Sequence, residues 1–458
     1  MADRMKAVIA GALLLPPGDE RGREYRQRLS LPSPAHIAWQ KHGKGREPDP
    51  TVTCVARQDG GPWEGGAIVP RYAPEAGGAD RMVMPPEGER LHFRGEMRAY
   101  QTAAVNAVLD TELDSRRRTG YGGIIQAPCG AGKTSMGCRL MADIPTPAIV
   151  LVHTKDLADQ WVERVRSFLG VEAAVVGYGK GLDKLREARV TVGSLQTLAR
   201  SSWWDLHQAG KRWGLCIVDE AHHAPAATMA QVIAAMSGRW RVGLTATPKR
   251  ADGLTPWLHW ICGPTVAAIA PSVLERAGNV LAPQIVRRDV HDIALDGLEA
   301  HERDRRLAED ARRNHIVATA ARDAVAEGRR VLCLVKLVDH AHALAELMRS
   351  HGLRAEALVG ELPKAEREGT IDAMRSGDVE VVVATSLADE GLDAPRLDTA
   401  ILVHPSGNLG RVEQRIGRVC RPHPAAKPPR VIDLVDTWGP MQGYARRRWG
   451  LYRSRGWV

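Results

Sequence analysis

The chain has no closely spaced cysteine pair and no long apolar run. Its seven cysteines are scattered singly over 458 residues, which excludes the paired spacing of a zinc site or a disulfide framework. Reduced thiols are typical of cytoplasmic proteins. The apolar run 7–15 is followed by prolines and acidic residues, so it does not predict a signal peptide. No stretch approaches the roughly 20 apolar residues of a membrane span. We therefore expect a cytoplasmic protein without a membrane partner.

Acidic residues are outnumbered by basic ones. The chain has 63 Lys and Arg against 54 Asp and Glu, a net charge of +9 and a pI near 9.3. This balance favours polyanionic partners such as nucleic acid. A hydrophobic content of 44% and a charged content of 26% are ordinary for a soluble globular protein. The length allows for about three domains of roughly 150 residues each. Nothing in the sequence identifies a protein partner.

The most informative segment is a glycine-rich turn between a short apolar run and a stretch with helical spacing. Gly130 and Gly132 let the backbone wrap so that amide N–H groups face phosphate oxygens. Lys133 can reach the β- and γ-phosphates, and the Thr134 hydroxyl can ligate Mg²⁺. A glycine-rich turn can also be a simple connection, but the strand before it, the Lys-Thr pair and the helix after it favour an ATP site. The predicted nucleotide-binding residues of this loop are Pro128, Cys129, Gly130, Ala131, Gly132, Lys133, Thr134 and Ser135.

A pair of carboxylates follows a second apolar run, Leu215–Val218. Asp219 is placed to hold Mg²⁺ opposite Lys133 and Thr134. Glu220 is placed to polarise the attacking water as a general base. An acid pair after a strand can also be a solvated loop, but the phosphate loop upstream favours catalysis.

The pattern along the chain predicts an α/β protein. Residues 1–88 suggest a small accessory domain, irregular or β-rich, whose role the sequence does not reveal. Two tandem domains of parallel strands and helices follow, at 89–270 and 290–437, and only the first has a phosphate loop. Residues 438–458 form a basic, aromatic tail, which either grips nucleic acid or docks on the second domain. We expect the strands at 148–152, 190–192, 215–218, 331–335, 379–383, 400–403 and 430–434.

Ordered motifs between residues 98 and 421 resemble those of superfamily-two helicases and translocases. The resemblance implies two tandem RecA-like domains that hydrolyse ATP between them. Arg98-Ala-Tyr-Gln101 resembles the adenine-reading Q motif, and 243–248 resembles motif III, with Thr245 and Thr247 coupling ATP to nucleic acid. His153 and Thr154, with Trp161 beyond them, resemble motif Ia. The further residues for which the resemblance implies nucleic-acid contact in the first domain are Gly193, Ser194, Gln196, Thr197 and Arg250.

The second domain carries the remaining motifs. Thr385 resembles the motif V residue at a backbone phosphate, and Gly391 and Asp393 resemble those near the ribose. The segment 414–421 resembles motif VI. On a helix, Gln414, Arg418 and Arg421 would share one face, and the resemblance implies that an arginine from this face acts on the γ-phosphate together with Lys133.

Within the superfamily, residues 240–253 and 261–264 resemble the XPB-like and phage UvsW-like branch. XPB proteins carry Arg-Glu-Asp after motif III, whereas this chain has Arg250-Ala-Asp252. RNA-remodelling relatives end motif VI with Arg-Thr-Gly-Arg or Arg-Ala-Gly-Arg, whereas this chain has Arg418-Val-Cys-Arg421. We therefore expect an ATP- and Mg²⁺-dependent DNA helicase or translocase of phage or bacterial origin, acting on duplex, forked, branched or single-stranded DNA. An RNA helicase and an ATP-gated DNA clamp without unwinding activity are the alternatives.

Overall fold

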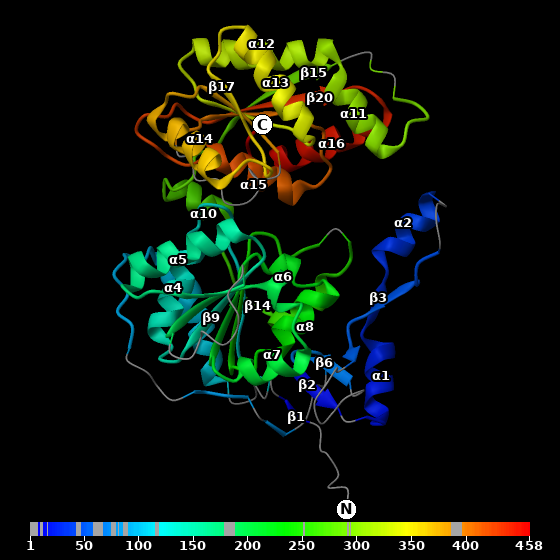
Figure 1. The fold of residues 1–458 in the computed structure, drawn as a ribbon, viewed down its shortest axis with the longest axis vertical. Coiled ribbons are helices and arrows are strands. Elements are labelled where there is room, and N and C mark those ends of the chain that lie inside the picture. The colour runs from blue at the N-terminus through cyan, green and yellow to red at the C-terminus, as the bar shows by residue number, and fades with distance from the viewer. Residues whose placement is uncertain are drawn as a thin grey trace, which may run out of the picture. The chain divides into compact units, whose positions relative to one another are not determined.

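The computed structural model describes residues 8–9, 12–15, 17–42, 47–57, 67–74, 79–80, 82–85, 90–114, 119–177, 188–250, 252–290, 293, 295–385 and 396–458. The chain divides into two compact units, Met1–Ala270 and Pro271–Val458 (Figure 1). Gly391 and Asp393, predicted to lie near the ribose, fall outside the described residues. Of the helices in the described part, none is long and apolar enough to cross a bilayer.

The first unit is built on a seven-stranded sheet in the order β10-β11-β9-β12-β13-β8-β14. Neighbouring strands are parallel throughout. Parallel strands are covered on both faces, which explains their continuous runs of Val, Ile and Leu. The strands are β8 Tyr121–Gln126, β9 Ala148–Val152, β10 Ala174–Val176, β11 Val190–Ser194, β12 Leu215–Val218, β13 Trp240–Thr245 and β14 Thr265–Ala268.

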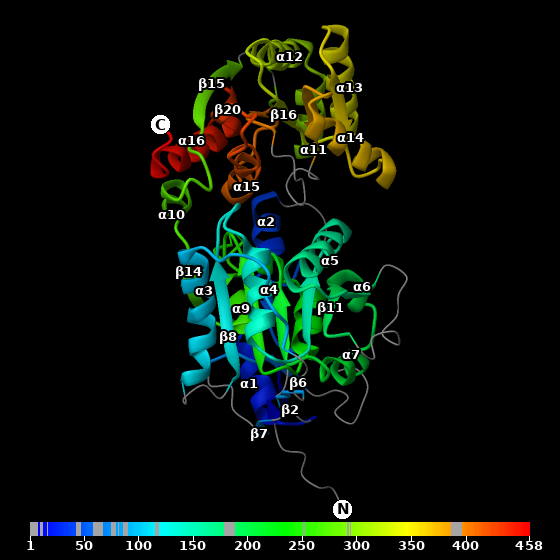
Figure 2. The same cartoon turned by 90° about the vertical axis from the view of Figure 1, so that its left-hand side faces the viewer.

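Helices form a layer on each face of this sheet. In Figure 2, α3, α4 and α5 lie on the side nearest the viewer. Helix α5 begins after Thr154, whose hydroxyl accepts the N–H of Leu157, and ends at Gly170 with a left-handed φ of 69°. The helices of the first sheet are α3 Ala99–Leu109, α4 Lys133–Asp143, α5 Lys155–Leu169, α6 Leu195–Leu198, α7 Trp203–Gly210, α8 Ala227–Ala235 and α9 Thr255–Cys262, with short 3₁₀ turns η1 Asp110–Leu113 and η3 Ala221–His223.

The N-terminal region folds around a five-stranded sheet in the order β5-β6-β2-β1-β7. All its neighbouring strands are antiparallel except β1 and β7. Its strands are β1 Val8–Ile9, β2 Ala12–Leu15, β5 Ala56–Arg57, β6 Ala67–Pro70 and β7 Ala79–Asp80, and beside them lie α1 Glu20–Arg28, α2 Pro34–His42 and a two-stranded pair, β3 Ser30–Pro32 and β4 Thr51–Thr53.

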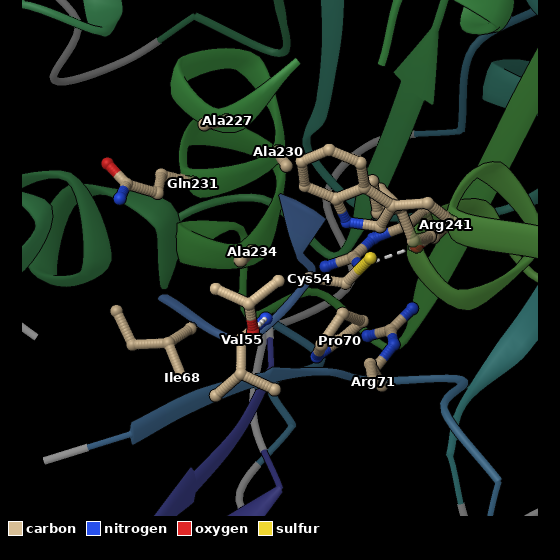
Figure 3. A pocket seen from close by; sticks show the side chains of 13 residues that line it. Cys54, Val55, Ile68, Pro70, Arg71, Ala227, Ala230, Gln231, Ala234 and Arg241 are labelled. Carbon is tan, nitrogen blue, oxygen red and sulfur yellow. Dashed lines mark hydrogen bonds between the residues drawn. The ribbon is translucent and has the colours of Figure 1, made fainter. Parts of the chain in front are cut away.

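This region belongs to the same compact unit as the first sheet. The fully buried Arg71 donates to the carbonyl of Gly238 at 2.7 Å, and Val83 forms a β-bridge to the same glycine. Between the region and helices α8 and α9 lies a cavity of about 190 Å³, where Cys54 and Ile68 face Ala230 (Figure 3). No residue of the phosphate loop lines this cavity.

The second unit has a six-stranded parallel sheet in the order β15-β20-β19-β16-β18-β17. Its strands are β15 Gln284–Val290, β16 Val331–Leu334, β17 Ala355–Leu358, β18 Val381–Ala384, β19 Thr399–Leu402 and β20 Arg430–Asp436. Its helices are α10 Pro271–Arg276, α11 Ala300–Glu309, α12 Ala311–Ala326, α13 Val338–Ser350, α14 Lys364–Ser376, α15 Leu409–Val419 and α16 Gly439–Ser454.

The C-terminal segment is part of this second unit. Helix α16 buries Tyr452 completely and leaves Arg448 only 2% exposed. The guanidinium of Arg448 donates to Asp433 at 2.7 and 3.0 Å, and the Tyr452 hydroxyl donates to the same carboxylate at 3.1 Å. Of the two interpretations of the tail, the structure therefore favours docking on the second domain.

Candidate active site

The phosphate loop joins the carboxyl end of β8 to the first turn of α4. Gly130 and Gly132 both adopt left-handed backbone angles, with φ of 82° and 80°. A Cβ at Gly132 would lie 2.4 Å from the amide nitrogen of Gln101, so this position needs glycine for two reasons. Pro128, Cys129, Gly130, Lys133, Thr134 and Ser135 are partly accessible, whereas Ala131 is buried. A glycine cradle in front of a helix N-terminus fits phosphate groups.

Gln101 ties α3 to this loop. Its amide nitrogen donates to the carbonyl of Ala131 at 2.8 Å and to Oγ of Ser135 at 3.4 Å. Its amide oxygen accepts the N–H of Arg98 at 2.9 Å. These bonds use both sides of the amide, so the adenine contact predicted for Gln101 requires some of them to be exchanged. That contact, and the one predicted for Arg98, stay predictions.

Lys133 forms an ion pair with Glu220 at the foot of the loop. Its Nζ lies 2.6 Å from Oε1 of Glu220, and the two side chains are only 13% and 14% exposed. Burial is the largest influence and by itself would lower the pKa of Lys133, but the surrounding negative charges, that of Glu220 foremost, together raise the lysine pKa above its ordinary value. Burial is also the largest influence on Glu220 and by itself would raise its pKa, but the charge of Lys133 and the contact with His222 together lower it below its ordinary value. Both groups are therefore charged at neutral pH.

Asp219 is held by bonds to both of its oxygens. The indole N–H of Trp161 donates to Oδ2 at 2.8 Å, and the N–H of Glu220 donates to Oδ1 at 2.9 Å. The side chain is buried; burial first, and then the charge of Glu220, raise the pKa of Asp219. Carboxylate and hydroxyl oxygens are the kind of ligand that Mg²⁺ prefers, so the chemistry of Asp219 and Thr134 suits the metal. That these two residues hold it stays a prediction.

The backbone at Glu220 is strained. Its φ of 45° is the only left-handed angle of a residue other than glycine in the described chain, and such strain clusters at functional sites. Oε2 of Glu220 lies 3.3 Å from Nδ1 of His222, which in turn lies 3.2 Å from Oγ1 of Thr245 at the end of β13. The same threonine hydroxyl accepts the N–H of Thr247 at 3.2 Å. Glu220 is thus linked to motif III.

Two of the predicted nucleic-acid motifs lie at the carboxyl ends of neighbouring strands in the first sheet. Strands β9 and β11 are parallel neighbours, and His153 and Thr154 follow β9, while Gly193 and Ser194 end β11. Ser194 caps α6 by accepting the N–H of Thr197 at 3.4 Å. In that first turn Gln196 is exposed and Thr197 is half-buried.

The side chain of Arg250 is held by an ion pair and hydrogen bonds to nearby residues. Its guanidinium pairs with Asp252 and also donates to the backbone carbonyl of His222. Arg250 therefore supports the turn η3 that follows the acid pair, and the nucleic-acid contact predicted for it requires one of these bonds to be released.

The structure corrects one expectation in the second unit. Gln414 and Arg418 lie on α15, but this helix ends at Val419, so Arg421 does not share their helix face. Pro422 follows Arg421, and a residue before proline is disfavoured in helical geometry. All three side chains are partly accessible. Thr385, directly after β18, is buried.

Sequence reasoning overlooked the bond from Trp161 to Asp219. Trp161 lies on α5 among buried residues at helical spacing (Leu157, Ala158, Val165), which would have indicated that its ring faces the sheet. Its hydrogen-bonding partner Asp219, which follows strand β12, has no signal in the sequence.

Comparisons with known families agree with this geometry. Residues 94–250 match the family described as type III restriction enzyme, res subunit, and residues 312–423 match the helicase conserved C-terminal domain. The chain is 27% identical to the DNA 3'-5' translocase XPB2 of Sulfurisphaera tokodaii, over 71% of this chain and 79% of the relative. It is 27% identical to the DNA 3'-5' helicase XPB of Kineococcus radiotolerans, over 79% and 64%, and 25% identical to the probable helicase D10 of Escherichia phage T5, over 73% and 72%. The matched part covers 79, 55, 58 and 64% of the length of four curated relatives.

Solved structures share the fold. The S. cerevisiae protein Dbp5 bound to RNA and ADP BeF3 aligns with a TM-score of 0.54 at 18% identity, covering 79% of this chain and 88% of that one. A fragment of a putative HsdR subunit of a type I restriction enzyme from Vibrio vulnificus aligns with a TM-score of 0.56 at 18% identity, covering 77% and 66%. The predicted pair of RecA-like parallel-sheet domains is thereby confirmed.

A phosphate loop, an acid pair and tandem parallel sheets together define a two-domain ATPase of the helicase type. The chain belongs to the superfamily-two helicases, which are ATP-hydrolysing enzymes, and within them to the XPB-like branch.

Proposed function

We propose that this chain is an ATP-dependent DNA translocase that moves along or remodels DNA. The observation that carries the proposal is the buried Lys133–Glu220 pair at the foot of the phosphate loop, with Asp219 beside it. Relatives named as DNA helicases or translocases, and a net charge of +9, support DNA as the partner.

Each residue of the site has a proposed role. Lys133 exchanges Glu220 for the triphosphate, and the loop N–H groups hold the phosphate oxygens. Asp219 and Thr134 would hold Mg²⁺, which neutralises phosphate charge when bound. Glu220, freed from the lysine, accepts a proton from water as general base.

Residues of the second unit complete the proposal. Gln414, Arg418 and Arg421 are proposed to act on the same triphosphate. Arg418 or Arg421 is proposed as the arginine finger, which is worth roughly 10³–10⁵ in rate in related phosphate chemistry. Thr385 is proposed to contact a backbone phosphate of the nucleic acid. Gly391 and Asp393 are proposed to lie near the ribose. Contacts to the phosphate backbone carry no sequence information, so movement should be largely independent of DNA sequence.

The proposal is tested by ATP hydrolysis with single-stranded, duplex and forked DNA and with RNA, in parallel at one salt concentration, because polyanion affinity depends steeply on salt. Displacement of a triplex-forming strand, measured on the same duplex, reports translocation without requiring unwinding. We expect stimulation by DNA and ATP-dependent triplex displacement. Stimulation by DNA without displacement would favour an ATP-gated clamp instead.

RNA is the second candidate partner. A relative that is 23% identical over 76% of this chain is named a putative ATP-dependent RNA helicase, from Acanthamoeba polyphaga mimivirus. Stronger stimulation by RNA than by any DNA would favour this alternative. The likeness to a phage T5 helicase supports action in the cytoplasm of a bacterial cell, including one infected by phage.

A further inference from the structure

Three histidine rings stand in a row between the motif Ia turn and the catalytic carboxylate. The ring centroids of His153 and His223 are 4.4 Å apart, and those of His223 and His222 are 4.2 Å apart. His222 then lies 3.3 Å from Oε2 of Glu220. A continuous line of contacts thus joins the end of β9 to the general base.

The two ends of this row sit on different functional segments. His153 is 8% exposed and precedes Thr154, the residue that caps α5. His223 ends the turn η3, which follows the acid pair. The two segments are held in register because the N–H of Asp219 donates to the carbonyl of Leu151 in β9 at 3.0 Å. Beside this backbone bond, the ring of His223 is the side chain of η3 that contacts His153.

The turn η3 is also supported by Arg250, which donates to the carbonyl of His222. Close-packed interiors have little free volume, so a ring that moves displaces its neighbour. A shift of the motif Ia turn when a nucleic-acid phosphate binds there would move His153, then His223, then the ring that contacts Glu220.

We propose that His223 is a positioning residue. When nucleic acid binds at the motif Ia turn, His223 transmits the resulting shift to Glu220. The inference rests on the proposed function, because it needs DNA or RNA to bind at His153 and Thr154. Proximity alone does not establish coupling, so the test must measure the coupling itself.

The variants are His223→Leu, which removes the ring at similar volume, and His223→Phe, which keeps a flat ring. For each we measure basal ATP turnover and KM, the turnover at saturating DNA, and DNA affinity. We expect His223→Leu to keep basal turnover, ATP KM and DNA affinity within about twofold. The DNA stimulation should fall by about five- to tenfold, the lower end of the factors typical of coupling between sites. His223→Phe should retain most of the stimulation.

Three outcomes would overturn the inference. Full stimulation in His223→Leu would show that the ring is not needed. An equal loss of basal and stimulated turnover would show that His223 only supports the catalytic site. Equal losses in the Leu and Phe variants would show that the ring stack is not the contact that matters. If His223→Leu does not fold, His223→Gln gives the same comparison with a polar side chain.

A double-mutant cycle with His153→Leu adds an independent test. If the two rings act together, the second substitution costs little stimulation once the first is present; independent, multiplying losses would contradict the proposal. A wild-type protein that hydrolyses ATP but responds to neither DNA nor RNA would instead refute the proposed function.

Discussion

Replacing Glu220 by glutamine should tighten nucleotide binding while slowing hydrolysis. In the structure Lys133 is held by Glu220 at 2.6 Å with both side chains largely buried, so an incoming triphosphate must compete with the carboxylate for the ammonium. Breaking a buried ion pair costs about 3–5 kcal/mol, whereas a glutamine oxygen still accepts a hydrogen bond from a charged donor worth roughly 1.5–3 kcal/mol. The difference of about 1–2 kcal/mol predicts roughly 5- to 30-fold tighter binding.

The assay is the Kd of a non-hydrolysable ATP analogue, measured by calorimetry, alongside the turnover of ATP. The matched control is Glu163→Gln, the same change of charge at an exposed position of α5. Loss of the general base should lower turnover by roughly 10²–10⁴-fold. Because the pKa of Lys133 is raised and that of Glu220 is lowered, the gain in affinity should be constant between about pH 6.5 and 8.5. An unchanged or weaker affinity in Glu220→Gln would refute the reasoning.

Other predictions concern the metal, acid stability and the C-terminal helix. Trp161→Phe removes the N–H donor to Asp219, and the Mg²⁺ concentration for half-maximal ATP turnover should rise by roughly tenfold or more; no change would mean that the bond does not position the ligand. Burial, with a smaller contribution from a nearby lysine, lowers the pKa of His207 to about 4. As the pH falls, His207 is therefore protonated in the unfolded chain before it is protonated in the folded one. The free energy of unfolding is unaffected by this group above about pH 6.5 and falls by about 2 kcal/mol at pH 5. His207→Phe should lose less Tm than wild type between pH 7 and 5, and an equal loss would contradict this. Arg448→Ala leaves its aspartate partner buried without a counter-charge and should destabilise the second unit by about 3–5 kcal/mol, whereas the exposed control Arg446→Ala should melt like wild type.

Local pattern was enough to predict the phosphate loop and most of the central strands, but the expected strands did not include β10, β13, β14, β15 or β17. Strand β12 with its acid pair and the left-handed glycines of the loop depend on residues close together in sequence. The resting partner of Lys133 could not be predicted, because Glu220 lies 87 residues away and is brought near by the order of strands in the sheet. Local sequence indicates which residues favour a helix or a strand, but it does not specify contacts between residues that are far apart in the chain.

The failures also have physical causes. Arg421 was expected on the face of α15, but the proline after it works against helical geometry there. The arginines of the tail offered two interpretations because arginine serves both phosphate binding and buried ion pairs. Only the packed position of Arg448 against Asp433 separates them. The Q motif residue Gln101 is recognisable in sequence, yet its bonds to the loop are a tertiary contact.

Lys133 is the residue proposed to bind the triphosphate, and every other proposed role at the site depends on it. ATP turnover at saturating duplex DNA should be compared between wild type, Lys133→Ala and the exposed control Lys211→Ala. The account predicts that Lys133→Ala loses roughly 10²-fold or more of the turnover, as expected for removal of a cationic stabiliser of phosphoryl transfer, while Lys211→Ala turns over like wild type. Hydrolysis by Lys133→Ala at the wild-type rate would contradict it.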